Sequence, residues 1–132
     1  MSSEIDRDKI MALCSTVWPK GWLGQPHDPV EGCLKFLRQA YREFGVYIEG
    51  TGTALLRDGR KFQKVHGPSF GATAIFGNVA QFGEYKHHVG LMLDDRWCIQ
   101  SSAATCGVGK IEITRHPFNI SIRGFYKPLC FL

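Results

Sequence analysis

The sequence predicts an α+β fold, in which N-terminal helices pack on an antiparallel β-sheet. Apolar residues recur at helical spacing before residue 45, and short strand-like runs follow one another after residue 71. Helices first and strands afterwards are typical of α+β proteins. The 132 residues contain no repeat, low-complexity tract or linker-like stretch, so we expect a single domain over residues 1–132.

The first 45 residues predict two helices joined by a loop. The first helix carries Ile10, Leu13, Cys14 and Val17 at the i, i+3, i+4 and i+7 positions of one face, and it must end before Pro19. Residues 18–32 hold three prolines and three glycines, which favours a loop. Gly45 stands where a glycine commonly ends a helix. The second helix has a continuous apolar face formed by Cys33, Phe36, Leu37, Ala40, Tyr41 and Phe44.

The rest of the chain predicts strands after an ambiguous stretch. Residues 46–70 are rich in glycine and basic residues and suit at most a short helix around Ala54–Arg57. The expected strands, rich in apolar and β-branched residues, are Ala72–Phe76, His88–Leu93, Arg96–Ser101, Lys110–Thr114 and Ile120–Tyr126.

Composition narrows the functional class. Hydrophobic residues make up 44% of the chain and charged residues 21%, as in ordinary globular proteins. The net charge of +4 comes from scattered lysines and arginines, and no nucleic-acid-binding motif accompanies them. The N-terminus is charged and lacks the apolar stretch of a signal peptide, and no run is long enough to cross a membrane, so we expect synthesis in the cytoplasm. Five cysteines without a C-x-x-C pair favour reduced thiols.

One cysteine and one histidine suggest nucleophilic catalysis. Cys33 opens the second helix, where the helix dipole favours a thiolate, and His88 opens a strand. A thiol protease builds its nucleophile from such a pair. A thiolate of this kind reacts with alkylating reagents at pH values well below the pKa of a free thiol. Read alone, Cys33 on an apolar face is more often a buried core cysteine than a nucleophile, and His87 is an alternative to His88.

The candidate site includes a third polar residue, Gln100. His88 and Gln100 are twelve positions apart across a predicted hairpin, so they share a face only if its loop has an odd number of residues, for example Asp94–Arg96. A two-residue Asp-Asp turn would place them on opposite faces. With the odd loop, we expect the Gln100 carbonyl to accept the His88 Nδ1–H and to turn Nε2 toward Cys33.

Together these residues resemble the NlpC-type cell-wall peptidases, a papain-like family. Residues 32–37 with Tyr41 and 44–46 are similar to its catalytic helix, and residues 88–93 to its His-Val-Gly-Ile strand. Residues 71–76 resemble the strand before that histidine, and residues 97–101 fall where the family has its third polar residue. The stretch from Gly107 to Pro128 resembles the compact members encoded with bacteriophage tail genes, and the whole likeness spans residues 20–128.

The resemblance implies a papain-like peptidase that hydrolyses an amide bond in peptidoglycan stem peptides, between the γ-carboxyl of D-glutamate and a diamino acid. It implies Cys33 as nucleophile, His88 as base and Gln100 as the third residue. Its oxyanion donors are the Cys33 N–H and a group from the preceding loop, Gln25 or Trp22. No metal or cofactor is expected. The phage likeness implies a location in the virion, on the tail, with tail-tip proteins as partners.

Three positions depart from the family pattern and favour an alternative. The family usually has Asp at the positions of Gly32 and Ala72 and most often His at that of Gln100. The alternative is a catalytically weak or inactive structural component of a phage tail tip with the same fold. Another is an amidase toxin injected by one bacterium into another. Cys98, Cys106, His87 and His116 carry metal-ligating side chains, but their spacing fits no common zinc pattern.

Overall fold

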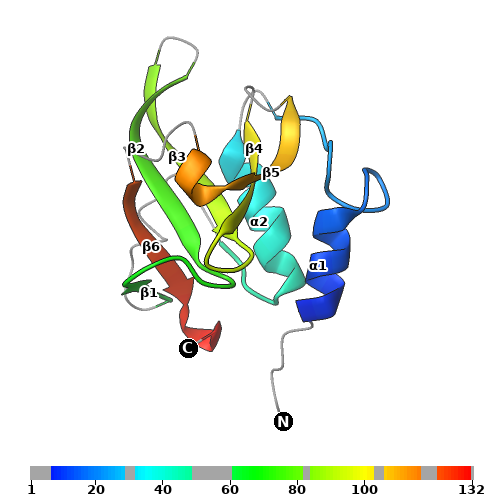
Figure 1. Cartoon of the computed structure of the whole chain (residues 1–132), viewed down its shortest axis with the longest axis horizontal. Helices are drawn as coiled ribbons and strands as arrows, with labels where there is room; N and C mark the ends of the chain where they lie inside the picture. The colour runs from blue at the N-terminus through cyan, green and yellow to red at the C-terminus, as the bar shows by residue number, and fades with distance from the viewer. Residues whose placement is uncertain are drawn as a thin grey trace.

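The helices precede an antiparallel sheet, as the sequence predicts (Figure 1). The computed structural model describes residues 7–28, 32–48, 61–81, 84–102, 106–116 and 122–131. Its helices are α1 (Arg7–Ser15) and α2 (Cys33–Glu43). Its strands are β1 (Phe62–Val65), β2 (Thr73–Gln81), β3 (Glu84–Met92), β4 (Trp97–Ser102), β5 (Gly107–Glu112) and β6 (Ile122–Pro128). Two 3₁₀ turns, η2 (Ile113–Arg115) and η4 (Leu129–Phe131), follow β5 and β6.

The six strands lie in the order β1-β6-β2-β3-β4-β5, and neighbouring strands are antiparallel. Five strands overlap predicted ones, but β2 continues to Gln81, beyond its predicted end at Phe76, while β3 and β5 start earlier than expected, at Glu84 and Gly107. The sequence did not predict β1, an edge strand with one buried residue, Phe62. The short helix expected around Ala54–Arg57 lies outside the described residues.

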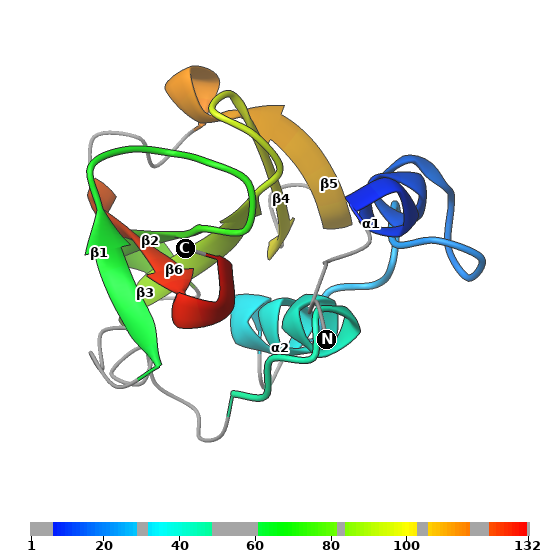
Figure 2. The ribbon, with the colours of Figure 1, turned by 90° about the horizontal axis from the view of Figure 1, so that it is seen from below.

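Helix α2 packs on β3 and β4 and buries the main core beneath it. Figure 2 shows α2 along one face of the sheet, with α1 beyond it on the side of β5. The hydroxyl of Tyr41, on α2, donates to the carbonyl of Gly71 at 2.8 Å and lies 2.5 Å from Thr73 Oγ1. Because this hydroxyl is buried, the two contacts satisfy a group whose isolation would be costly. They fix α2 against the start of β2.

The opposite face of the sheet carries a second, smaller core. Side chains alternate between faces along a strand, so Val89 and Leu91 face α2 while Met92 faces away from it. The second core contains Ala72, Ala74, Phe76, Met92, Cys98 and Ile113. His88 is the cross-strand partner of Phe76 and therefore projects toward this second core.

Gly90 permits the close packing of this second face. A Cβ at Gly90 would overlap the Sγ of Cys98 and would lie 3.4 Å from the Cβ of Gln100. We expect Gly90→Ala to lower the free energy of unfolding by about 1–3 kcal/mol, because a well-packed core resists an added methyl group. Urea denaturation measures this loss. Adding Cys98→Ala, which removes the obstructing sulfur, should make the double variant lose less than the two single losses combined.

The matched control is Gly67→Ala, since a Cβ at Gly67 meets nothing within 4 Å. It should change stability by less than about 0.5 kcal/mol. Equal losses for Gly90→Ala and Gly67→Ala would show that Gly90 is not needed for packing.

Candidate active site around Cys33 and His88

Cys33 occupies the first position of α2 and is 8% exposed. The residue before it, Gly32, has φ 62° and ψ −142°, a conformation that side chains disfavour, and makes no side-chain cap. The backbone N–H groups of Cys33, Leu34 and Val89 point toward the sulfur and favour a thiolate, but burial is the larger effect and raises the pKa of Cys33. This direction is opposite to the lowered thiol pKa that the sequence predicts for a catalytic cysteine.

The N-terminus of α2 reaches the sheet where β3 and β4 separate. The N–H of Met92 donates to Ala72, on the β2 side of β3, while the N–H of Leu93 donates to Trp97, in β4. N–H directions alternate along a strand, so the N–H of Val89 points to the β4 side. The described β3–β4 pairing stops at Leu91 and Ile99. The Val89 N–H therefore faces the Cys33 sulfur instead of a β4 carbonyl.

The register of the β3–β4 hairpin places His88 and Gln100 on one face, as predicted for an odd loop. Met92 pairs with Cys98, and the N–H of Leu93 bonds to Trp97, which leaves a three-residue loop at 94–96. His88 and Gln100 are both buried, and His88 Nε2 lies 2.5 Å from Gln100 Oε1. A carbonyl oxygen only accepts, so this contact makes Nε2 the protonated nitrogen.

The ring of His88 is therefore turned the other way from our expectation. Nε2, not Nδ1, bonds to Gln100, and the lone pair is on Nδ1. The physical reason is the position of Gln100, whose side-chain carbonyl lies within reach of the far end of the ring. Nδ1 is the ring nitrogen nearer the backbone, whereas Nε2 is at the far end of the ring and reaches the neighbouring strand.

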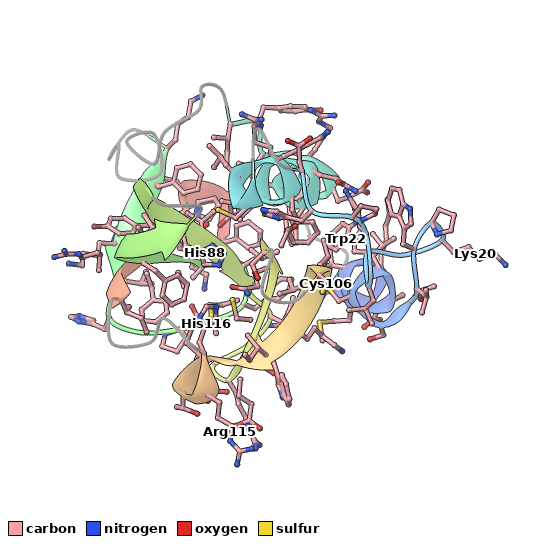
Figure 3. The ribbon with its side chains drawn as sticks, turned by 90° about the horizontal axis from the view of Figure 1, so that it is seen from above. Lys20, Trp22, His88, Cys106, Arg115 and His116 are labelled. Atoms are coloured by element: carbon pink, nitrogen blue, oxygen red, sulfur yellow. The ribbon has the colours of Figure 1, made fainter. Side chains whose placement is uncertain are left out.

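His116, which the sequence analysis considered only as a metal ligand, is a second partner of Gln100. Its Nε2 bonds to the same Oε1 that accepts from His88. The ring of His116 stacks on Phe76 with centroids 4.3 Å apart, and its centroid lies 5.6 Å from that of His88. No local pattern could have revealed this contact, because His116 follows β5 and is brought back by η2. Figure 3 labels the two histidines next to each other, on the side of the sheet where η2 lies.

Both imidazoles are neutral at pH 7. Burial lowers the pKa of His88 to about 4; the bond to Gln100 opposes this effect, and the neighbouring His27 adds to it. Burial also lowers the pKa of His116 to about 4, with His88 as a further cause. Together with the raised pKa of Cys33, these directions define a resting site of neutral thiol and neutral imidazole.

The side chains of Trp22 and Gln25, the two predicted oxyanion donors in the loop before α2, have other described contacts. Trp22 is buried, with its ring edge-on to Phe36 at 5.5 Å. The amide of Gln25 donates to Gln39 Oε1 at 2.8 Å. Gln39 is six residues along α2 from Cys33, about 9 Å along the helix axis. Neither side chain has a described contact with Cys33.

His27 is the loop residue that lies near the start of α2, and the sequence analysis did not select it. Its Cε1 is 4.0 Å from the position of a Cβ on Gly32, and its Nδ1 lies 2.8 Å from Ser101 Oγ. Burial lowers the pKa of His27, and the adjacent Asp28 opposes the effect. A polar ring thus lies beside the start of α2, next to the candidate nucleophile.

Among the described residues, no three His, Cys, Asp or Glu side chains gather closely enough to hold a metal ion. Cys98 is buried and Cys106 exposed, and the side chain of His87 is outside the described part of the chain. Within the same residues, no helix has the length and apolar character needed to span a membrane.

Comparison with solved structures identifies the fold. The chain superimposes on a lipoprotein of the NLP/P60 family from Staphylococcus aureus with a TM-score of 0.66 and 15% sequence identity. The match covers 92% of this chain and 40% of the other, so the chain spans well under half of that protein. No protein-family model and no curated protein sequence matches the chain. The fold is thus NLP/P60-like, and at this identity the likeness concerns fold alone.

The two buried histidines make stability depend on acidity. Their pKa values of about 4 in the folded protein lie below the ordinary value of 6.5, so between pH 6.5 and 4 the unfolded chain binds protons that the folded protein does not. Stability is therefore complete above about pH 6.5 and falls as the pH drops toward 4. The expected loss is roughly 2–3 kcal/mol for each ring, measured by urea denaturation at a series of pH values.

Two variants test whether the buried histidines cause this loss of stability at low pH. His116→Phe should remove roughly half of the dependence, because one of the two titrating rings is gone. His66→Gln replaces an exposed histidine and should leave the dependence unchanged. A wild-type stability that stays constant from pH 6.5 to 4.5 would mean that the histidines are not held neutral by the fold.

Proposed function

We propose that this protein is a cysteine hydrolase that cuts amide bonds in peptidoglycan stem peptides, with Cys33 as nucleophile, His88 as base and Gln100 as the residue that orients the ring. The observation that carries the proposal is the hydrogen bond from His88 Nε2 to Gln100 Oε1. It gives the near ring nitrogen, Nδ1, the lone pair that a base requires. The adjacent residue, Val89, directs its N–H to the Cys33 sulfur. The contact between the sulfur and the backbone next to His88 supports the proposed pairing of nucleophile and base.

The chemistry begins from the neutral pair. As Cys33 Sγ bonds to the substrate carbonyl carbon, its proton passes to His88 Nδ1, and the oxyanion accepts the backbone N–H of Cys33. The imidazolium then protonates the leaving amine as the C–N bond breaks. Water hydrolyses the resulting thioester, giving its proton to His88 and restoring the thiol. Gln100 orients the ring throughout without adding charge.

The substrate and setting rest on resemblance. The NLP/P60-like fold and the motifs around Cys33 and His88 support a cell-wall peptide as substrate, and we propose the γ-D-glutamyl–diamino acid bond within it. The resemblance of residues 107–128 to phage tail-associated proteins supports a second proposal, that a virion tail carries the enzyme to the cell wall.

Release of muropeptides from purified sacculi tests the hydrolase. Wild-type protein should release new stem-peptide fragments, identified by mass spectrometry, and Cys33→Ala should release none. Gln100→Ala should retain the nucleophile but lower kcat by about 10-fold to 100-fold, because the imidazole loses its orienting partner. Fragments from both wild type and Cys33→Ala would indicate another nucleophile, and none from folded wild type would contradict the proposal.

A second candidate, a non-catalytic structural component with the same fold, is favoured by the burial of Cys33 and the raised pKa of its thiol. Alkylation with iodoacetamide between pH 5 and 9, followed by peptide mapping, separates the two functions. A catalytic Cys33 should react at neutral pH at a rate that falls several-fold in His88→Ala, because the imidazole removes the thiol proton. A structural Cys33 should stay protected in both proteins, while the exposed Cys106 and Cys130 react equally and serve as internal controls.

A further inference from the structure

We propose that His116 is a positioning residue for the candidate site: through the carbonyl of Gln100 that it shares with His88, it fixes the tautomer of the His88 ring. Both imidazoles donate from Nε2 to one oxygen, Gln100 Oε1. The effect of His116 on activity rests on the proposed hydrolase function. Its effect on the tautomer of His88 does not depend on any activity.

The orientation of the Gln100 amide decides which nitrogen of His88 is the base. With Oε1 toward the rings, Nε2 must carry the proton and Nδ1 the lone pair. A reversed amide would present its NH₂ group, so Nε2 would accept and Nδ1 would hold the proton. In that state His88 could not take a proton from Cys33 through Nδ1. Correct orientation of the amide is therefore a requirement of the proposed chemistry.

The strands hold this orientation only weakly without His116. On the other side of the amide, Gln100 Nε2 is 3.4 Å from Ser102 Oγ, a long contact. A carbonyl oxygen has two lone pairs, and His88 and His116 use both. Reversal of the amide would require both rings to change tautomer together. With His88 alone, only one ring would have to change.

The structure also restrains the ring of His116 itself. It is 2% exposed and stacks on Phe76 with an angle of 20° between the ring planes. Its backbone N–H donates to the carbonyl of Ile113 at 3.3 Å, in the turn that follows β5. Phe76 is in turn the cross-strand partner of His88. The donor of His116 is thus positioned by the strand that pairs with the base-bearing strand.

Two variants separate the hydrogen bond from the packing. His116→Phe keeps an aromatic ring on Phe76 but removes the N–H donor. His116→Gln loses the ring but keeps a side-chain N–H at a similar reach. Nitrogen-15 NMR of histidine-labelled protein at pH 7 reports the tautomer of each ring directly. Hydrolysis of a purified stem peptide reports kcat and KM separately.

We expect both rings of the wild type to be Nε2–H tautomers. In His116→Phe, a substantial share of His88 should shift to Nδ1–H, and kcat should fall about 10-fold with KM nearly unchanged. In His116→Gln, the Nε2–H form and most of kcat should return. Because the phenylalanine keeps the packing and the glutamine keeps the donor, this pattern would not arise from packing alone.

Each other outcome is also decisive. Wild-type rings in the Nδ1–H form would overturn the proposal, because the amide would then face the other way. An unchanged His88 tautomer in a folded His116→Phe protein would reduce His116 to a packing residue. If His116→Phe does not fold, His116→Gln is compared with His116→Asn, whose amide is too short to reach, and equal tautomers would overturn the proposal. The expected tautomers without hydrolysis would contradict the hydrolase and not the role of His116.

Discussion

The candidate site depends on the three-residue turn that sets the register of β3 and β4. The side chain of Asp94 closes it: Oδ1 accepts the backbone N–H of Arg96 at 2.8 Å and that of Trp97 at 2.6 Å. A turn shorter by one residue would carry every later side chain of β4 to the other face. Gln100 would then enter the main core under α2, and His88 would lose its orienting partner. A local hydrogen-bonding preference of aspartate in turns thus determines the geometry of residues six positions away on either side.

The sequence was most informative where structure is set by neighbours along the chain. The apolar face of α2 and the parity of the β3–β4 loop are local, and the structure agrees with both. β1 was not predicted, because four residues carry little pattern and the strand forms only by pairing with β6, about 60 residues away. The contact between His116 and Gln100 is non-local in the same way. The wrong nitrogen was assigned to His88 because the choice depends on where the Gln100 carbonyl lies along the ring, which spacing does not encode.

The departures from the usual NlpC-type residues have physical explanations in this fold. At position 32 the backbone has a positive φ, which glycine adopts without the strain that an aspartate would cause. Ala72 is fully buried in the second core, where a carboxylate would be desolvated. Gln100 is the most informative case. A neutral imidazole in its place would offer one acceptor, whereas the amide oxygen accepts from both histidines. Gln100 and His116 therefore suit each other as a pair.

A site that rests in neutral form balances stability against reactivity. Burying a thiol and two neutral imidazoles avoids the desolvation cost of separate charges, and the shared amide satisfies both ring donors. The same burial makes His88 a weak base and Cys33 a weak acid, so transfer of the proton between them is unfavourable in the resting protein. In a low-dielectric setting, however, adjacent charges of opposite sign attract strongly, and backbone N–H groups already face the sulfur. In the proposed mechanism, the proton transfer would therefore be most favourable during attack, when the developing bond to carbon removes negative charge from the sulfur. In the proposed hydrolase, substrate would select the reactive state, and the buried neutral pair would stay unreactive without it.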